Sequence, residues 1–343
     1  MPSSAEPHEA PGIGDAPHDD GRHDGEDAGA AWMRHMRRGD WAAAWALSDA
    51  ALAARGDTPG WHLPRHEQTL WDGRALDGRR VLVHCYHGLG DTLQFARFLP
   101  QLAAVAAEVS VWAQPALMPL LAAVPGVDRL LPLHDGAPDA ARDANVEIME
   151  LGHVFRVTPA TLPGDVPYLT VPAAARAPRA ADGRLHVGVV WSCGDWNREQ
   201  RSIPFALLEP LFRLPGVTLH VLQRGPALAE CPPTLGVHDG SDDVVAAAGL
   251  VRSLDLVLTV DTMMAHLAGA LGAPVWTLLP QPADWRWMEG RDTSPWYPTM
   301  RLFRQPTPGD WPAVIARVRD ALLAHAAASP PPPARRPPPA THP

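Results

Sequence analysis

Three stretches of the sequence combine residue types that could do chemistry, and each directly follows a short apolar run. The first stretch is His87-Gly88-Leu89-Gly90-Asp91-Thr92. Gly88 and Gly90 permit a tight turn and a close approach of the backbone to a ligand. Asp91 stands where a helix is expected to begin, so two interpretations stay open: an N-cap carboxylate, or a general base at the mouth of a cleft.

A dinucleotide-binding loop is a further interpretation of the same stretch. The third glycine position of that motif is occupied by Leu93, and the end of the next expected strand, Trp112-Ala113-Gln114, has no acid to hold a ribose. Both departures argue against a nicotinamide-dependent enzyme.

The second stretch is Val260-Asp261-Thr262-Met263-Met264-Ala265-His266. The free N–H groups and the positive end of a helix that starts here favour a phosphate. Asp261 would repel a phosphate and is better suited to accepting hydrogen bonds from sugar hydroxyls. His266 lies one turn after Thr262, and it is either a binding residue or a core histidine packed on the sheet.

The third stretch is a polar loop from Ser192 to Ser202 that contains Arg201. A guanidinium can clamp a diphosphate with two parallel hydrogen bonds, although Arg201 could equally be a solvated loop arginine. Gln223 and Arg224 follow the next expected strand and leave the same two interpretations open.

Four aromatic residues stand close together after these stretches: Trp285, Trp287, Trp296 and Tyr297. Such side chains can stack on a nucleobase or a sugar, or they can fill a hydrophobic seam under a long loop. The seam is the favoured interpretation.

The elements that must position these residues alternate between strands and helices. Strands are expected at 81–84, 109–113, 127–132 and 146–149, and again at 185–191, 217–222, 254–260 and 274–279. Helices are expected at about 91–106 and 115–123, and near 205–214, 242–252 and 262–271. This alternation predicts two parallel sheets covered by helices, in which ligands bind beyond the carboxyl ends of the strands. A last helix, at about 311–327, could return across the hinge between the two halves.

The predicted domain organisation follows from these patterns. Residues 1–27 form an acidic tail with too few apolar side chains to fold, and its His8, His18 and His23 are a weak metal-binding candidate at most. Residues 28–66 form one helical hairpin of the tetratricopeptide type, which must pack on the main body because a single repeat cannot form a solenoid. The remaining boundaries are an N-terminal Rossmann-like domain at 67–172, a linker at 173–184, a C-terminal Rossmann-like domain at 185–327, and a proline-rich tail at 328–343.

Composition excludes several classes of protein. The chain has 343 residues and a net charge of −9, and all 29 basic residues are arginine, without a basic stripe that would suit nucleic acid. No apolar run approaches the roughly 18–20 residues that span a bilayer, and the N-terminus has no signal-peptide pattern. The three cysteines are Cys85, Cys193 and Cys231, whose spacing indicates neither a disulfide framework nor a zinc site. A reducing cytoplasm is the expected location.

Taken together, several motifs resemble a known family. Leu70-Trp71-Asp72-Gly73 and His87-Gly88-Leu89-Gly90-Asp91-Thr92-Leu93-Gln94-Phe95-Ala96-Arg97 resemble the opening of the tetratricopeptide-associated branch of glycosyltransferase family 9, which includes heptosyltransferases. Four later stretches resemble the second half of the family's sequences: Arg201-Ser202-Ile203-Pro204, Leu222-Gln223-Arg224-Gly225, Val260-Asp261-Thr262 through Pro274-Val275-Trp276, and Asp284-Trp285-Arg286-Trp287 through Arg304-Gln305. The resemblance covers about residues 68–325 in the order of the family. Relatives commonly carry Glu-Gln where this chain has Tyr86-His87.

The resemblance implies a GT-B fold and metal-independent, inverting sugar transfer without a cofactor. It implies Asp91 as general base, and it places the donor at Asp261, Thr262, Met263 and His266, with the helix start taking the diphosphate. Gln223, Arg224 and Arg201 are the other expected donor residues, Arg201 replacing the lysine often found in heptosyltransferases. His87, Gly88, Gly90, Gln94 and Ser192 are expected to line the cleft.

The resulting hypothesis is a glycosyltransferase that moves a heptose or hexose from a nucleotide diphosphate to a hydroxyl of a glycan, lipid or protein. Lipopolysaccharide synthesis at the inner face of the membrane is one expected setting. Closure of the two domains about residues 172–184 would exclude water. The alternatives are a nucleotide-sugar epimerase of the same fold and a non-catalytic partner-binding protein on a transferase scaffold.

Overall fold

A computed structural model describes residues 27–56 and 63–328. The first of its two sheets is built from apolar runs of the N-terminal half. The strands are β1 (Arg80–His84), β2 (Glu108–Ala113), β3 (Arg129–Pro132) and β4 (Ala144–Glu147). They are parallel in the order β3-β2-β1-β4, and Val83 pairs with Val111 on one side and with Val146 on the other. All four strands were predicted, with bounds that differ by at most two residues. The tails predicted at 1–27 and 328–343, with the His8, His18 and His23 cluster, lie almost wholly outside the described residues.

The second sheet has five parallel strands, one more than predicted. They are β5 (Leu185–Val190), β6 (Val217–Val221), β7 (Leu256–Val260), β8 (Val275–Leu279) and β9 (Met300–Arg304), in the order β6-β5-β7-β8-β9. The missed strand is β9, which pairs with β8 through Thr277 and Leu302. Two arginines interrupt its apolar run: Arg301 is exposed, as a strand at the edge of a sheet allows, and Arg304 is half-buried and donates to the carbonyls of Arg291 and Trp287.

Short helices connect the strands. The helix predicted at about 91–106 is broken into α3 (Leu89–Phe95), a 3₁₀ turn (Ala96–Phe98) and α4 (Leu99–Ala103). Pro100 has no backbone N–H to continue an earlier helix, and it lies in the first turn of α4, where none is needed. The remaining helices of the two halves are α5 (Met118–Leu121), α6 (Leu151–Val154), α7 (Arg198–Arg201), α8 (Phe205–Leu208), α9 (Val244–Val251), α10 (Met263–Ala270) and α11 (Trp311–Ala328).

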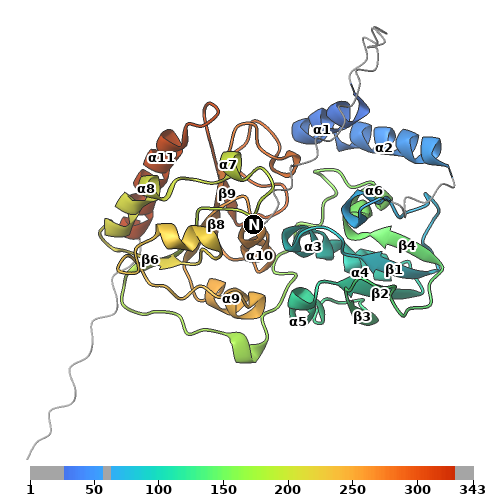
Figure 1. The fold of residues 1–343 in the computed structure, drawn as a ribbon, viewed down its shortest axis with the longest axis horizontal. Coiled ribbons are helices and arrows are strands. Elements are labelled where there is room, and N and C mark those ends of the chain that lie inside the picture. Colours follow the sequence, from blue (N-terminus) through green and yellow to red (C-terminus); the bar gives the residue numbers. More distant parts are fainter. Residues whose placement is uncertain (1–26, 57–62, 329–343) are drawn as a thin grey trace, which may run out of the picture.

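The predicted helical hairpin is present as α1 (Ala28–Arg38) and α2 (Trp41–Arg55), joined by Gly39 at a φ of 82°. It lies across both halves of the molecule (Figure 1). Trp45 Nε1 donates to the carbonyl of Val157 in the N-terminal half, and the carbonyl of Arg37 accepts from Glu289 N in the C-terminal half.

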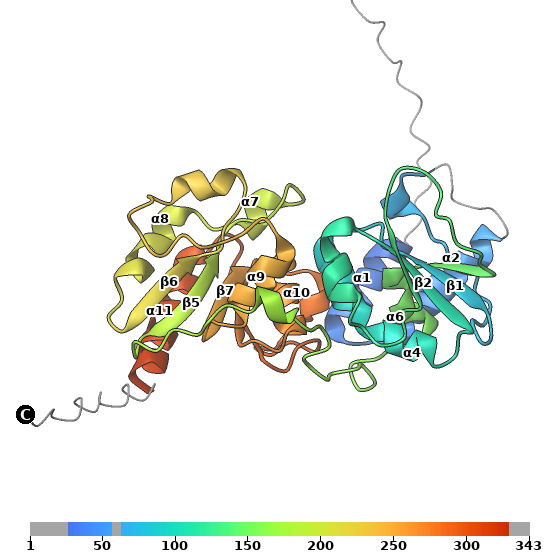
Figure 2. The same cartoon turned by 90° about the horizontal axis from the view of Figure 1, so that it is seen from below.

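The two sheets lie side by side, and their facing sides share one hydrophobic core (Figure 2). This core contains Trp41 of the hairpin, Val83 of the first sheet, and Leu267 and Val275 of the second half. A separate core on the second sheet holds Val318 and other buried residues of α11. The last helix therefore packs on the outer side of its own sheet, beside α8 and β9, and the expectation that it returns across the hinge is wrong.

The segment between the two halves also has close neighbours. It includes a 3₁₀ turn at Ala173–Ala175 that contacts α9. A Cβ atom at Gly249 would lie 1.7 Å from the carbonyl oxygen of Ala175, so only glycine fits on this helix face. The predicted linker is therefore packed against the C-terminal half at this point.

Candidate active site

The N-termini of α3 and α10 meet between the two sheets. A Cβ atom at Gly90 would lie 3.3 Å from Met263 Cα and 3.0 Å from the ring of His266. Gly88 is the N-cap of α3, and Thr262 Oγ1 caps α10 by accepting from Met264 N at 3.2 Å. The carboxyl ends of β1 and β7 lead into these two helix starts, so parallel topology brings the first two predicted stretches together.

Asp91 lies at this junction, two residues after the start of α3 rather than at its N-cap. Its Oδ2 accepts from the N–H of Gly88 at 3.0 Å, and its Oδ1 forms an ion pair with Arg286 Nη2 at 2.7 Å. Asp91 is therefore not the N-cap residue itself, because α3 begins at Leu89, but its carboxylate still caps the helix start by accepting from the N–H of the N-cap residue Gly88. The side chain is 25% exposed, which leaves the carboxylate within reach of a bound molecule.

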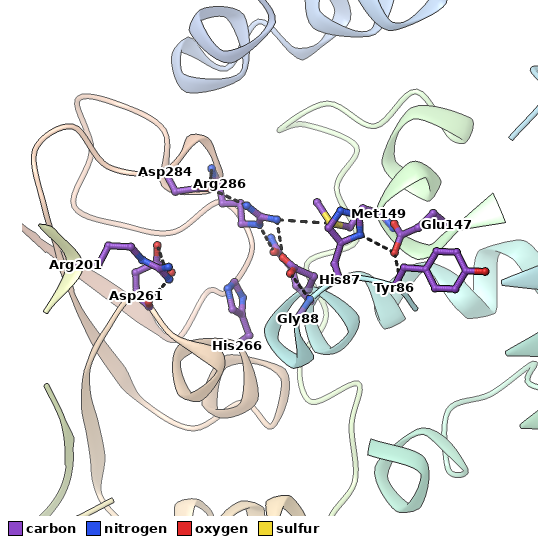
Figure 3. A network of polar contacts seen from close by, with 12 residues as sticks. Tyr86, His87, Gly88, Glu147, Met149, Arg201, Asp261, His266, Asp284 and Arg286 are labelled. Carbon is purple, nitrogen blue, oxygen red and sulfur yellow. Dashed lines mark hydrogen bonds and ion pairs between the residues drawn. The ribbon is translucent and has the colours of Figure 1, made fainter. Parts of the chain in front are cut away.

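Arg286 is the residue that the sequence analysis did not assign. Its side chain is 12% exposed; it pairs with Asp284 at 3.0 Å and donates from Nε to Gln94 Oε1 at 2.9 Å (Figure 3). Burial acts to lower the pKa of Arg286, but the carboxylates of Asp284 and Asp91 raise it above its ordinary value. Arg286 therefore carries a permanent positive charge beside Asp91. The sequence drew attention to Arg286 only as part of the motif Asp284-Trp285-Arg286-Trp287. Because arginine stands at every Lys or Arg position of this chain, its presence in the motif does not indicate which carboxylate it pairs with.

Asp261 and Arg201 form a second charged contact at the start of α10. Arg201 Nη2 donates to the carbonyl of Asp261 and lies 3.7 Å from its Oδ2, and the guanidinium stacks over the Trp196 ring at 5.0 Å. Burial raises the pKa of Asp261, an effect that Arg201 opposes. Arg201 thus lies at the start of α10 and stays a predicted donor residue, although it does not line the cavity beyond the carboxyl ends of β5, β6 and β7.

His266 is buried one turn into α10. It stacks on Trp287 with ring centroids 5.4 Å apart, and Nδ1 lies 3.0 Å from the Tyr297 hydroxyl. Burial, with the positive charges of Arg286 and Arg97, lowers the pKa of His266 well below its ordinary value. The ring is therefore neutral near pH 7 and belongs to the protein interior. The aromatic residues named in the sequence analysis, Trp285, Trp287, Trp296 and Tyr297, are all buried, as the seam interpretation predicted.

A cavity of about 500 Å³ lies beyond the carboxyl ends of β5, β6 and β7. Five residues predicted for the donor or the cleft line it: Ser192, Gln223, Arg224, Thr262 and Met263. This donor-side cavity has the size of sites that hold small molecules.

Two of these side chains are already engaged by the protein. Gln223 is 5% exposed, and its Oε1 accepts from the backbone N–H groups of Trp191 and Ser192 at 3.0 and 2.8 Å. It therefore holds the loop that forms the cavity wall. Arg224 pairs with Asp242 at the surface, where Nε and Oδ1 are 2.9 Å apart.

His87 points away from the donor-side cavity. Its Nδ1 lies 3.0 Å from Oε1 of Glu147, whose side chain is 2% exposed (Figure 3). Burial acts to lower the pKa of His87, whereas the contact with Glu147 and the charge of Asp91 raise it above its ordinary value. His87 thus lies beside a buried carboxylate, with which it forms an ion pair when its imidazole is protonated.

Neither a metal cluster nor a membrane span is found in the described part of the chain. Across residues 27–56 and 63–328, no three His, Cys, Asp or Glu side chains are grouped so that they could hold a metal ion. Within the same ranges, no helix has the length and apolar character to cross a bilayer.

Comparisons with known proteins show which solved structures share this fold. The fold is similar to the crystal structure of a glycosyl transferase family 9 protein from Veillonella parvula DSM 2008, with a TM-score of 0.54 and 13% identity, covering 74% of this chain and 99% of that one. It is also similar to E. coli ADP-heptose lps heptosyltransferase II, with a TM-score of 0.51 and 14% identity, covering 73% and 100%. These likenesses confirm the predicted GT-B fold.

The sequence itself is 28% identical over 317 residues to Protein FlbA of Caulobacter vibrioides, a match that covers 80% of this chain and 51% of FlbA. The chain therefore spans about half the length of the curated relative that it matches. No family model matches the sequence.

Proposed function

We propose that this chain, which has the fold of glycosyltransferase family 9, transfers a sugar from a nucleotide diphosphate donor to a hydroxyl acceptor. One observation carries the proposal: Asp91 lies in the first turn of α3, whose start packs against the start of α10, and Leu89 and Met263 of these two helix starts line the donor-side cavity. A general base and an anion-binding helix start are the two parts that an inverting transfer without a metal needs.

In the proposed reaction the nucleoside diphosphate occupies the donor-side cavity, and its phosphates meet the N-terminus of α10. Free backbone N–H groups, the helix dipole and Arg201 would stabilise the negative charge of the leaving diphosphate. The donor residues proposed for this role are Arg201, Arg224, Thr262 and Met263, with Gln223 and Ser192 shaping the wall.

Asp91 is proposed to accept the proton of the acceptor hydroxyl. The acceptor oxygen then attacks the anomeric carbon, the bond from that carbon to the diphosphate breaks, and the nucleoside diphosphate leaves with the electron pair. Arg286 and the N–H of Gly88 hold the two carboxylate oxygens and thereby fix the direction from which a hydroxyl can approach. The buried His266 and Asp261 would support the α10 start from beneath.

The donor is tested first by calorimetric titration with ADP-, GDP- and UDP-sugars, beginning with ADP-heptose because a structure of the same fold is named for it. Asp91→Asn should reduce turnover of the donor that binds by about 10³-fold, within the range ascribed to a positioned general base, while its Kd changes little. Asp320→Asn is the matched control, because Asp320 also pairs with an arginine but on the surface of α11.

Each alternative has its own outcome. Isomerisation of the nucleotide sugar by the protein alone would replace the transferase with an epimerase. Failure of every nucleotide sugar to bind would favour a non-catalytic partner-binding protein. Loss of donor binding in a folded Asp91→Asn variant would remove Asp91 from the role of base.

A further inference from the structure

A second cavity, of about 380 Å³, lies between the helical hairpin, the first sheet and the C-terminal half. Its wall includes six tryptophans from three parts of the chain, which is why we call it the indole cavity: Trp32, Trp41, Trp45, Trp71, Trp285 and Trp296. No residue that lines it also lines the donor-side cavity. The hairpin thus forms one wall of a space that the two Rossmann-like halves do not enclose alone.

One end of the indole cavity is polar and rigidly built. Glu147 accepts from Met149 N at 2.7 Å and from Tyr86 N at 3.3 Å, and it contacts His87 at 3.0 Å. Both Glu147 and His87 line the cavity. A buried carboxylate with an imidazole beside it offers hydrogen-bond partners to a hydroxyl group that enters this end.

The same end adjoins Asp91. Met149 lines the cavity, and its sulfur lies 3.9 Å from Nη2 of Arg286, the nitrogen that pairs with Asp91. Trp285 also lines it, and the guanidinium of Arg286 lies over the Trp285 ring at 4.7 Å. A molecule in the indole cavity would therefore have the Asp91–Arg286 pair as its nearest charged neighbour on the side of the donor.

The lining favours an uncharged ring over a phosphate or a flexible chain. Glu67 and Glu147 would repel an anion, and Arg55 is the one arginine in the described lining. The apolar indole atoms of the wall suit the C–H groups of a ring, and the polar groups at one end suit its hydroxyls. The phosphates of the donor are proposed to bind at the start of α10. The indole cavity is therefore available to the acceptor.

We propose that the indole cavity binds the acceptor, and that the bound group is a neutral pyranose ring whose hydroxyl lies at the end of the cavity lined by His87 and Glu147, next to the Asp91–Arg286 pair. This inference rests on the proposed transferase function. It goes further in assigning the hairpin a part in acceptor recognition and in naming the acceptor class.

Filling the cavity tests the proposal. Ala51 is exposed on α2 and lines the indole cavity, whereas its neighbour Ala50 is exposed on the same helix and does not. Ala51→Trp should raise the KM or Kd for an acceptor sugar by about tenfold or more, because the indole occupies the space of the ring. Ala50→Trp adds the same side chain beside the cavity and should behave as the wild type. Equal thermal midpoints for the two variants would show that neither disturbs the fold.

The probes are methyl pyranosides. Their binding is measured by saturation-transfer NMR with the donor absent, and their use as acceptors is measured by transfer assays with the donor present. We expect methyl pyranosides to bind the wild type and Ala50→Trp and to lose binding to Ala51→Trp. Donor binding measured by calorimetry should be the same in the wild type and both variants. The proposal is overturned if no methyl pyranoside binds the wild type, or if Ala51→Trp binds and transfers normally. Pyranoside binding is measured without the donor. If no donor binds in the calorimetric titration, the transferase function is refuted, but pyranoside binding to the indole cavity can still be judged from the NMR result.

Discussion

At the scale of single residues, the site is organised around one buried arginine. Arg286 contacts Asp91, Asp284 and Gln94, which come from both halves of the chain. Removing such a charge would leave buried carboxylates without a partner, at a cost larger than that of a surface ion pair. We therefore interpret Arg286 as a positioning residue for Asp91 that also joins the two halves.

A second buried charge offers a measurable pH dependence. Glu150 accepts hydrogen bonds from the backbone N–H groups of Leu70, Trp71 and Glu147, at the point where the chain leaves the hairpin. Burial nevertheless raises the pKa of Glu150 from 4.5 to about 7, with the charge of Glu147 adding to the effect. The folded state therefore holds this proton more tightly than the unfolded state does.

It follows that the Glu150 contribution to stability is fully present below about pH 4.5 and is lost as the pH rises through 7. The loss should amount to at most about 3 kcal/mol of unfolding free energy. Urea unfolding of the wild type and of Glu150→Gln between pH 4.5 and 8 measures it, and the variant should show a flatter dependence. Parallel curves for the two proteins would contradict this assignment.

At the scale of elements, the junction of α3 and α10 depends on the absence of a side chain at Gly90. An added methyl group there would meet the Met263 backbone at 3.3 Å and the His266 ring at 3.0 Å. Neither neighbour can move freely, since Met263 is part of the α10 backbone and His266 is stacked on Trp287. Close packing of the two helix starts brings Leu89 of α3 and Met263 of α10 to the wall of the donor-side cavity, with Asp91 two residues after Leu89.

Gly90→Ala should therefore lower the unfolding free energy by about 1–3 kcal/mol and reduce sugar transfer together with it. Gly164→Ala is the matched control, because a methyl group at Gly164 meets nothing closer than the carbonyl oxygen of Leu162 at 4.0 Å and Gly164 lines neither cavity. Urea unfolding and a turnover assay of both variants measure the two effects. A Gly90→Ala protein as stable and active as the wild type would show that the helix starts are not closely packed in solution.

At the scale of the whole molecule, the two Rossmann-like halves and the hairpin share one core. Arg97 of the N-terminal half is 5% exposed, donates to the carbonyl of Trp296 at 2.7 Å, and lies over the Tyr297 ring at 4.9 Å. Trp32 of the hairpin packs edge-on against Trp285 with ring centroids 5.4 Å apart. A large rotation about residues 172–184 would expose these buried groups, so smaller movements of the loops around the donor-side cavity are the expected response to substrate.

The shared core predicts that both halves unfold in one cooperative transition. Arg97→Met should lower the stability of both halves by about 3 kcal/mol, since buried carbonyls lose their donor. Arg319→Met on the surface of α11 is the control. Hydrogen exchange followed by mass spectrometry reports β1 and β7 separately, and protection that falls in one strand alone would contradict a common core.

The sequence by itself was sufficient to predict two parallel sheets, the hairpin, and the carboxyl-end location of Asp91, Asp261 and Thr262. These features depend on apolar runs and turn residues a few positions apart, so neighbours in the chain encode them. Only the tertiary structure decided that Arg286 pairs with Asp91 across 195 positions, that the hairpin spans both halves, and that a tryptophan-lined cavity lies beneath it. Such contacts depend on how separately formed elements dock, and a buried arginine in one segment carries no local mark of the carboxylate that it will meet in another.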